Sequence, residues 1–562
     1  MRLHHKAIAA AASSLLLALT ACSGGGEDAK GEKLNRDELA AKAEYNPQPR
    51  ADVKEGGTFT EALRTVPDNL NALHADANTD TVELWKLYNP QLQYLSEDGR
   101  TSWNKNYVTD VSDEVSGGNR VVTYTINDKA EFNDGTPIDW RAFEALWKAS
   151  NGKSKKYAPA LTEGFSLITS VKPGKNDKQA VVTYDGPWLW WESQFKWLMH
   201  PDATKDATAF NTAYTKSSHG EWGAGPFRVK KLAPGGTTAV FERNPHWWGE
   251  PSKLDRIVVR AMEYSAQINA FRNGEIDAVQ AHSAEDLAQI KGMKNIETRR
   301  AADLSVAFMH VNASSPKLRD PDVRKAVQLG VDRATLQKVR YDGMNWEAGL
   351  PGMITLYPFQ KGYRDLYAEL GGGYDPEQAK KLLDEAGWTV GDGGVREKDG
   401  KRLELLFPVI GDAPYDKNVS VALQAMLKEI GVDLKLDHRN SQAYADTYTK
   451  QDYDVFLMNW GTLAPDENFF YFCYFYCSDT GYTDQRTVDT YAPKVQEIGR
   501  ATDKQKAVDA FIKTEKEILG TWQVLPMYNA PKIWAVKKGL ANFGADLFFF
   551  GPQADIGWQK AA

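Results

Sequence analysis

YDVFLMNWGTLAPDENFFYFCYFYC, residues 453–477, is the stretch around which this chain is organised. Residues 453–460 are apolar and too few for a helix of typical length, so they predict a buried strand. Gly461 and Pro465 then end that strand. A buried strand that runs into an aromatic loop with few charges is typical of a cleft wall, because aromatic rings offer contact area at little entropic cost. An ordinary corner of the core is the alternative.

The first residues of the chain predict export. A basic start, a short apolar run and small residues before Cys22 resemble a bacterial lipobox. The resemblance implies a signal peptide of residues 1–21, cleavage before Cys22 and lipidation of that cysteine; a plain secretory leader is the alternative. Residues 22–50 are Gly-rich and charged, so we expect a flexible tether that holds the folded chain at the extracytoplasmic face of the cell membrane.

Composition narrows the classes of protein further. The chain has 562 residues, of which 42% are hydrophobic, enough for two or three domains with ample core. No apolar run after the leader reaches the roughly 18 residues of a membrane helix. The net charge is −7, and removing a leader that carries two positive and no negative side chains leaves −9. This balance argues against nucleic acid as a partner.

Cysteines and motifs give little sign of metal or catalysis. Cys473 and Cys477 remain after Cys22, and in an exported protein such a pair more commonly forms a disulfide than a zinc site, which would need two further ligands. The chain has no GxSxG, HExxH or GxxxxGK[ST] motif. Its nine histidines are scattered. We therefore expect no metal, no cofactor and no enzyme activity.

Strand and helix patterns alternate along the chain, which predicts an α/β fold. Residues 57–63 alternate like a first strand, and apolar spacing predicts a helix over residues 78–94. Residues 121–126 and 179–184 predict antiparallel strands that flank a helix at 139–148.

Four tryptophans lie within residues 187–199. They suit either a sugar-stacking platform or, at helical spacing, the core, and the core is the commoner outcome.

Several segments carry a family resemblance. EFNDGTPIDW, residues 131–140, resembles a signature of the family-5 extracellular solute-binding proteins of ABC importers, the group that binds oligopeptides, dipeptides and nickel. Six more segments resemble the family's signatures in the same order: GAGPF at 223–227, ERNPHWW at 242–248, FRNGEID at 271–277, DVRKAVQLGVD at 322–332, YDPEQAKKLLDEAGW at 374–388 and QAMLKEIGV at 424–432. Each signal is weak alone, but together they identify the chain as a member over residues 57–535.

These segments also have a local structural interpretation. Gly223 and Gly225 predict a tight backbone passage. Asp375 and Pro376 predict the start of a helix that Gly387 ends. We read them as determinants of the fold with no ligand contact.

The resemblance implies a bilobal periplasmic-binding-protein-like fold of type II, with the three-domain family-5 (cluster C) architecture and two strands that cross between the lobes. Residues 306–311 and 524–528 predict those crossing strands. A hinge of two strands lets the lobes close over a ligand. The implied domains are domain I at 51–95, 219–312 and 524–562, domain II at 96–218 and domain III at 313–523.

The implied function is the capture of peptides between the lobes and their delivery to an ABC permease by a monomer. Peptide binders of this family hold the ligand as an extended strand, and an aspartate in a G-W-x-x-D pattern pairs with its amino group. Residues 459–462 follow this pattern, but Leu463 replaces the aspartate, and a buried ammonium without its partner costs several kcal/mol. A non-peptide solute (an oligosaccharide, an opine or a nickel chelate) and a non-transporting scaffold are the alternatives.

The resemblance suggests candidate ligand-binding residues on two walls. On the first wall we expect Trp460 to stack on the ligand, with core packing as the alternative, and Asp466 or Glu467 to replace the missing carboxylate, with helix capping as the alternative for Asp466. Arg439 could bind a ligand carboxylate or form a surface ion pair. The remaining candidates are Asn459, Gly461 and Thr462 on the first wall, and Val66, Asn69, Tyr88 and Asn89 on the second. Cys473 and Cys477 resemble a disulfide of some relatives that would brace the aromatic loop.

Overall fold

The computed structural model describes residues 43–96, 101–346, 349–358, 362–461, 484–546 and 551–560. Six predicted residues lie outside these ranges: Cys22, Thr462, Asp466, Glu467, Cys473 and Cys477. Within the described ranges, no helix has both the length and the apolar character needed to cross a membrane.

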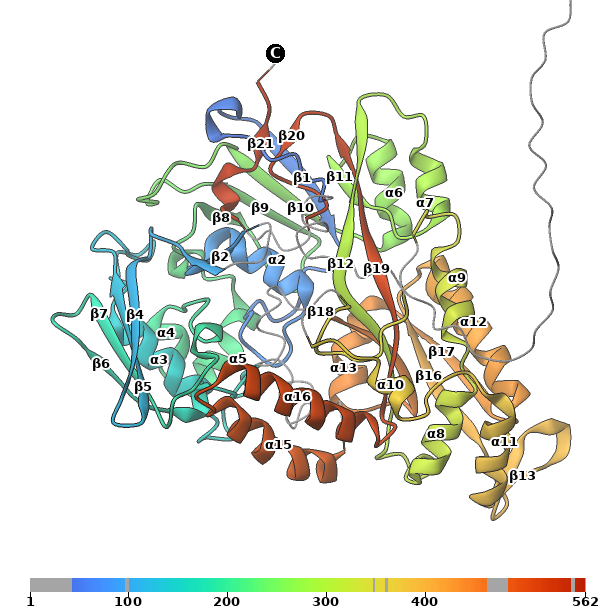
Figure 1. Ribbon diagram of the computed structural model, residues 1–562. Coiled ribbons are helices and arrows are strands. Elements are labelled where there is room, and N and C mark those ends of the chain that lie inside the picture. Colours follow the sequence, from blue (N-terminus) through green and yellow to red (C-terminus); the bar gives the residue numbers. More distant parts are fainter. Residues whose placement is uncertain are drawn as a thin grey trace, which may run out of the picture. The chain divides into compact units, whose positions relative to one another are not determined.

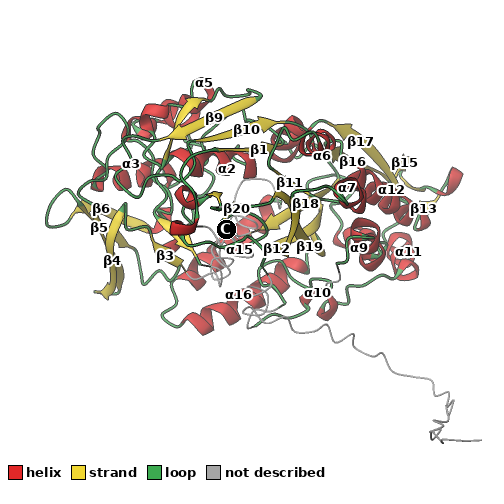
Figure 2. Ribbon diagram, turned by 90° about the horizontal axis from the view of Figure 1, so that it is seen from above, coloured by secondary structure: helices red, strands yellow, loops and turns green. Residues whose placement is uncertain are grey.

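Two long strands form the centre of one four-stranded sheet. β12 (Ile296–Val311) and β19 (Val524–Lys537) run antiparallel and side by side in both ribbon views (Figures 1 and 2). They contain the two predicted crossing strands, residues 306–311 and 524–528. Their sheet has the order β11-β19-β12-β18, where β11 is Ala278–Gln280 and β18 is Val455–Gly461.

β18 confirms the buried strand predicted at residues 453–460. It pairs antiparallel with β12, from Val455 opposite Val311 to Gly461 opposite Ser305. Burial decreases along the strand, since Val455 is fully buried and Asn459 is exposed. The strand therefore begins in the core and ends at the surface of the described structure.

A second sheet contains the first predicted strand and has the order β1-β10-β9-β8. Its strands are β1 (Thr58–Leu63), β8 (Phe227–Lys231), β9 (Thr238–Arg243) and β10 (Arg256–Ala261). β1 runs parallel to β10, and the other neighbours are antiparallel. Helices α6 (Tyr264–Arg272) and α7 (Ala284–Ile290) follow β10 along the chain.

Helix α2 (Thr79–Tyr88) begins where the sequence predicts, with Asn78 accepting a hydrogen bond from Thr81 N. The prediction that the helix runs to residue 94 is wrong. Pro90 forces the preceding residue out of helical geometry, and Asn89 is accordingly extended.

The third sheet has the order β4-β5-β7-β6, and its antiparallel pair β5–β7 confirms the predicted strands at 121–126 and 179–184. α3 (Trp140–Ser150) is the predicted intervening helix, and Asp139 caps it by accepting from Arg141 N. The remaining bounds here are β2 (Gln93–Leu95), β3 (Thr101–Trp103), β4 (Val108–Ser116), β5 (Asn119–Ile126), β6 (Ile168–Pro173), β7 (Gln179–Tyr184), α4 (Pro201–Thr204) and α5 (Ala207–Lys216).

In the described part of residues 313–523, helices surround a parallel strand pair, β16 and β17. α12 packs on both strands, beside α9 (Figure 1). α11 starts at Pro376 with Asp375 as its cap, as predicted. The bounds are α8 (Pro321–Leu329), α9 (Arg333–Tyr341), α10 (Leu366–Glu369), α11 (Pro376–Glu385), β13 (Thr389–Val390), β14 (Arg396–Lys398), β15 (Lys401–Arg402), β16 (Glu404–Ile410), α12 (Pro414–Glu429), β17 (Asp433–Arg439), α13 (Tyr444–Thr449), α15 (Gln485–Gly499) and α16 (Lys504–Leu519). Near the carboxyl end, β20 (Leu540–Ala541) pairs with β21 (Gly557–Trp558).

Two further expectations are confirmed by packing. Trp188, Trp190 and Trp191 are all less than 9% exposed and belong to the largest apolar cluster, which agrees with the core interpretation of that run. A Cβ atom on Gly223 would lie 2.6 Å from the carbonyl oxygen of Tyr88, so the chain passes too close to α2 for any side chain there.

Candidate ligand-binding site

The edge of β18 is the first feature of the site. β12 is the only strand that pairs with β18 within the described ranges. Where β18 begins, Asp454 N donates to the Leu406 carbonyl oxygen of β16 at 3.0 Å. Beyond this contact, the side of β18 that faces away from β12 presents backbone groups with no strand partner in the described part of the chain, which is the edge that an added strand requires.

Three predicted residues of the first wall lie on this edge strand. Asn459 pairs with Ala307, Trp460 with Val306 and Gly461 with Ser305. Asn459 and Gly461 are exposed. The stacking role of Trp460 stays a prediction.

The predicted second wall is packed more deeply. Val66 is fully buried, Asn69 is 6% exposed, and Tyr88 is 1% exposed. The Tyr88 hydroxyl donates to the Ser218 carbonyl oxygen at 3.1 Å, while Asn69 Oδ1 accepts from Asn71 N at 3.1 Å. The Tyr88 hydroxyl is therefore paired, whereas Asn69 Nδ2 is buried without a hydrogen-bond partner within the described residues. Ligand contact by either side chain stays a prediction.

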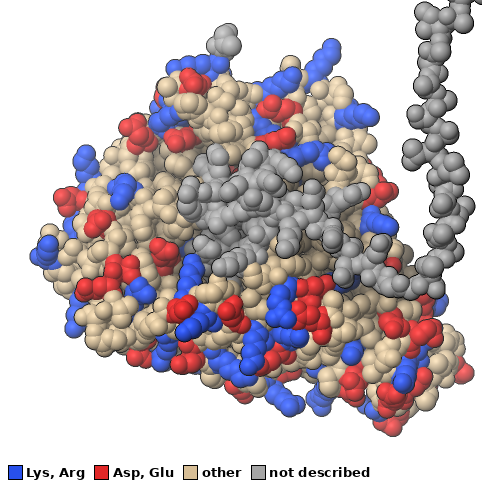
Figure 3. Space-filling view, in the orientation of Figure 1, with Lys and Arg blue, Asp and Glu red and all other residues tan. Residues whose placement is uncertain are grey.

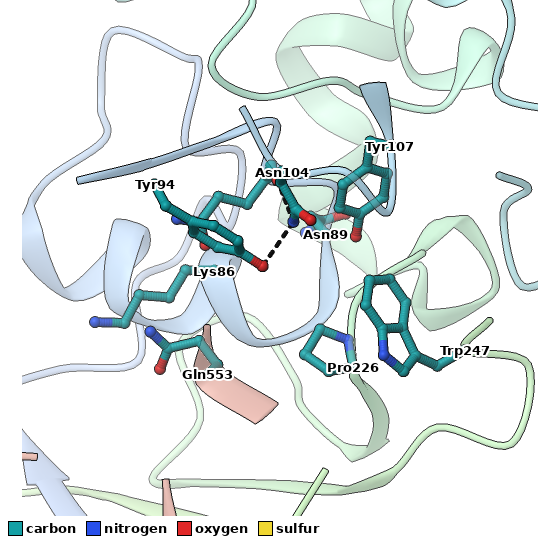
Figure 4. A pocket seen from close by; sticks show the side chains of 9 residues that line it. Lys86, Asn89, Tyr94, Asn104, Tyr107, Pro226, Trp247 and Gln553 are labelled. Atoms are coloured by element: carbon teal, nitrogen blue, oxygen red, sulfur yellow. Dashed lines mark hydrogen bonds between the residues drawn. The ribbon is translucent and has the colours of Figure 1, made fainter. Parts of the chain in front are cut away.

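Asn89 lines a small polar pocket at the end of α2 (Figure 4). Neither amide atom of Asn89 has a hydrogen-bond partner within the described residues. Across the pocket, Asn104 Nδ2 donates to the Tyr94 hydroxyl at 2.7 Å. The space of about 10 Å³ holds one water molecule, so we expect a buried water to satisfy Asn89.

Arg439 is held by its neighbours. Its Nε donates to Asp437 Oδ2 at 2.8 Å, its Nη1 donates to Thr447 Oγ1 at 2.8 Å, and its Nη2 lies 2.9 Å from Asp452 Oδ2. These contacts agree with the ion-pair alternative, and binding of a ligand carboxylate by Arg439 stays a prediction.

A cluster of aromatic and charged side chains joins segments that lie far apart in sequence. The Arg64 guanidinium lies 5.6 Å from the Tyr264 ring centroid, and that ring lies 4.4 Å from the His282 ring. Arg340 Nη1 of α9 donates to the His282 carbonyl oxygen at 2.5 Å. Sequence reasoning missed this cluster because its members are single residues that no local spacing connects.

The electrostatics of this cluster follow from partial burial. Burial, with help from Arg340 and Arg64, lowers the pKa of His282 to about 3, so its imidazole is neutral at physiological pH. Burial raises the pKa of Asp416 in the first turn of α12 to about 6, although the two arginines act in the opposite direction.

A second contact joins the β4–β7 region to helices α15 and α16. Leu189 N donates to the Gly499 carbonyl oxygen at 3.0 Å. Arg500 Nη2 lies 2.7 Å from Asp185 Oδ2, and the rings of Trp190 and Phe511 meet edge to face at 5.1 Å. We call this set, Asp185–Trp190 against Gly499, Arg500 and Phe511, the tryptophan contact. It joins residues of predicted domain II to residues of predicted domain III.

Charge on the face seen in Figure 3 is mixed, with lysine and arginine side chains interspersed among aspartate and glutamate. In the described residues, no group of three or more histidine, cysteine, aspartate or glutamate side chains is arranged to hold a metal ion.

Comparison with known proteins decides the family. The model of the bacterial extracellular solute-binding proteins, family 5, matches residues 101–482. The chain belongs to this family. The oligopeptide-binding protein OppA of Mycobacterium tuberculosis is 30% identical over 542 residues, which cover 94% of this chain and 90% of OppA.

Solved structures of similar proteins agree on the fold. A periplasmic EDTA-binding protein, EppA, matches with a TM-score of 0.76 at 22% identity, over 93% of this chain and 99% of that one. AppA of Bacillus subtilis, solved with a nonapeptide, matches with a TM-score of 0.75 at 17% identity, over 90% and 100%. The predicted bilobal type II fold is confirmed, and this family-5 chain is a solute-binding protein of ABC importers.

Proposed function

We propose that this family-5 protein captures peptides between its two lobes and delivers them to an ABC permease, without catalysing a reaction. The observation that carries the proposal is the edge of β18, which lies directly beside the crossing strand β12. A peptide laid along this edge would add a strand to the sheet that joins the lobes.

Main-chain pairing suits a carrier of varied peptides. Hydrogen bonds between backbones provide affinity that depends little on the peptide's side chains. Asn459 and Gly461 of this edge strand are exposed. Similarity to OppA, named for oligopeptide binding, supports the same ligand class.

The domain plan completes the proposal. Residues 51–95, 219–312 and 524–562 form domain I, residues 96–218 form domain II, and residues 313–523 form domain III. Strands β12 and β19 then cross between the lobes and serve as the hinge.

The same proposal covers the placement of the protein in the cell envelope. Residues 1–21 are removed, lipid on Cys22 anchors a monomer at the extracytoplasmic face, and residues 22–50 form the tether. A disulfide between Cys473 and Cys477 braces the loop that follows β18.

Native mass spectrometry of the purified mature protein tests the ligand class. We expect a ladder of peptide masses on the protein, because binding through the backbone retains a mixture of sequences. Protein that is unfolded to remove its ligand, refolded and exposed again to a peptide mixture is the control, and it should regain the ladder. A single sugar or metal-chelate mass, or no uptake of peptide after refolding, would contradict the proposal.

A non-peptide solute is the second candidate. Leu463 removes the carboxylate that peptide binders of this family use for the ligand's amino group. Similarity to the EDTA-binding EppA extends over nearly the whole chain. A chelate or another small anion in the mass spectrum would favour this candidate.

A further inference from the structure

A bulge in β12 places a carboxylate beside the end of β18. Between Ala302 and Val306, β12 has three residues where its partner β19 has one. Such an insertion bends the strand and turns a side chain out of the ladder. Ser305 is the last residue of β12 that pairs with β18. Asp303, two residues before it, therefore lies just beyond the described end of β18.

Ser305 links this carboxylate to a buried amide. The Ser305 hydroxyl donates to Asp303 Oδ2 at 2.9 Å, and Asn529 Nδ2 donates to the Ser305 carbonyl oxygen at 3.0 Å. Asn529 is 8% exposed, and its Oδ1 has no hydrogen-bond partner within the described residues. Because Nδ2 must face the carbonyl, Oδ1 is fixed as a buried acceptor. An unpaired acceptor in such a place is costly, so it calls for a donor.

The charges around the bulge leave Asp303 without an ion-pair partner among the described residues. Lys532 interacts electrostatically with Asp303. Its Nζ atom, however, forms an ion pair with Asp546 Oδ1 at 2.8 Å. Burial would lower the pKa of Lys532, while Asp546 and then Asp303 raise it. Because Lys532 Nζ pairs with Asp546, it acts on Asp303 only through space, and the Asp303 carboxylate has no ion pair of its own within the described residues.

We propose that Asp303 and Asn529 bind the α-ammonium group of the ligand. This inference rests on the proposed function, in which a peptide lies along β18. An ammonium group carries a positive charge and three N–H donors. Asp303 supplies the opposite charge, and Asn529 Oδ1 supplies an acceptor. The pair thus takes over the role of the aspartate that Leu463 replaces.

Other ligand groups fit the bulge less well. A ligand carboxylate would meet the negative charge of Asp303, and a sugar hydroxyl would leave that charge unpaired in a half-buried place. An acetylated peptide loses both the charge and two of the three donors. The site therefore selects peptides with a free amino terminus.

Calorimetry of the mature full-length protein tests this selection. The probes are synthetic peptides of three to eight residues, each made with a free and with an acetylated amino terminus. We expect the wild type to bind the free form at least 10-fold more tightly. Asp303→Asn should weaken binding of the free form about 10-fold or more and leave the acetylated form within about twofold. Asn529→Ala should weaken the free form severalfold.

A matched control and a pH profile separate recognition from a structural role. Asp113→Asn removes a carboxylate that pairs with Arg120 on the distant β4–β5 sheet and should change neither affinity. Because an α-amino group has a pKa of about 8, the preference of the wild type for the free form should fade above that pH, whereas Asp303→Asn should show no such profile.

Each other result overturns the inference. Equal weakening of both peptide forms by Asp303→Asn would mean that Asp303 only supports the fold. A wild type without preference for the free form would exclude ammonium recognition while leaving peptide capture intact. A wild type that binds neither form would refute the proposed function, and this inference with it.

Discussion

Replacing Gly499 with alanine should weaken ligand binding by blocking the tryptophan contact. A Cβ atom at this position would lie 1.9 Å from Trp188 Cζ3 and 2.7 Å from two neighbouring ring atoms. Ordinary van der Waals contact begins at 3.4 Å, so the indole ring or helix α15 would have to move by about 1.5 Å.

The surroundings leave little freedom for that movement. Trp188 Nε1 donates to Gln194 Oε1 at 3.1 Å, and the adjacent Leu189 N is bonded to Gly499 itself. Overpacking of this kind costs about 1–3 kcal/mol. If the contact forms when the lobes close, the whole cost falls on the closed state, and the dissociation constant for peptide rises about 5- to 150-fold.

Titration calorimetry measures this effect, using a peptide that the wild type binds and comparing Gly499→Ala with the wild type. Gly373→Ala is the matched control. No atom lies within 4 Å of a Cβ atom on Gly373, so the control should keep wild-type affinity. Alanine favours a helix over glycine by about 1 kcal/mol, so the substitution should not destabilise α15 itself. A loss of affinity would therefore come from the contact with Trp188. Unchanged affinity in Gly499→Ala would refute the reasoning.

Three further predictions concern Trp460, Glu515 and the pair Cys473 and Cys477. Trp460→Ala should remove about 1–3 kcal/mol of peptide binding by calorimetry if the ring stacks on the ligand, and an unchanged dissociation constant would exclude it from the site. Glu515 is 1% exposed, and burial raises its pKa to about 7; because the folded state then holds the proton more tightly, stability should fall as pH rises from about 4.5 to about 7. Glu515→Gln should abolish that fall, worth about 3 kcal/mol, in thermal unfolding at pH 5 and 8, and an unaltered pH dependence would count against it. Thiol counting on the folded, nonreduced mature protein should find no free thiol at Cys473 and Cys477, whereas two free thiols would dismiss the disulfide.

Local patterns in the sequence were sufficient for much of the fold. The apolar run at 453–460 became β18, and the cap at Asp375 started α11. Such features depend on residues close in sequence, which interact in the same way in most folds. The helix predicted to reach residue 94 failed for a local reason too, because the effect of Pro90 on Asn89 was overlooked.

The features that matter most for the site come from long-range pairing. The bulge at Asp303 exists only because β12 and β19 pair with unequal numbers of residues. The close approach of Trp188 to Gly499 joins segments about 300 residues apart. Neither position shows a spacing or composition signal, so the sequence could indicate a solute-binding fold without locating these residues.

Small-angle X-ray scattering during a peptide titration tests most directly the claim that two lobes close on a peptide. The mature protein, freed of ligand by unfolding and refolding, would be titrated with a peptide of the kind detected by native mass spectrometry. We predict that the radius of gyration decreases and reaches its limit at the same peptide concentration as the calorimetric binding curve. A scattering curve that stays unchanged while the peptide saturates the protein would contradict the account.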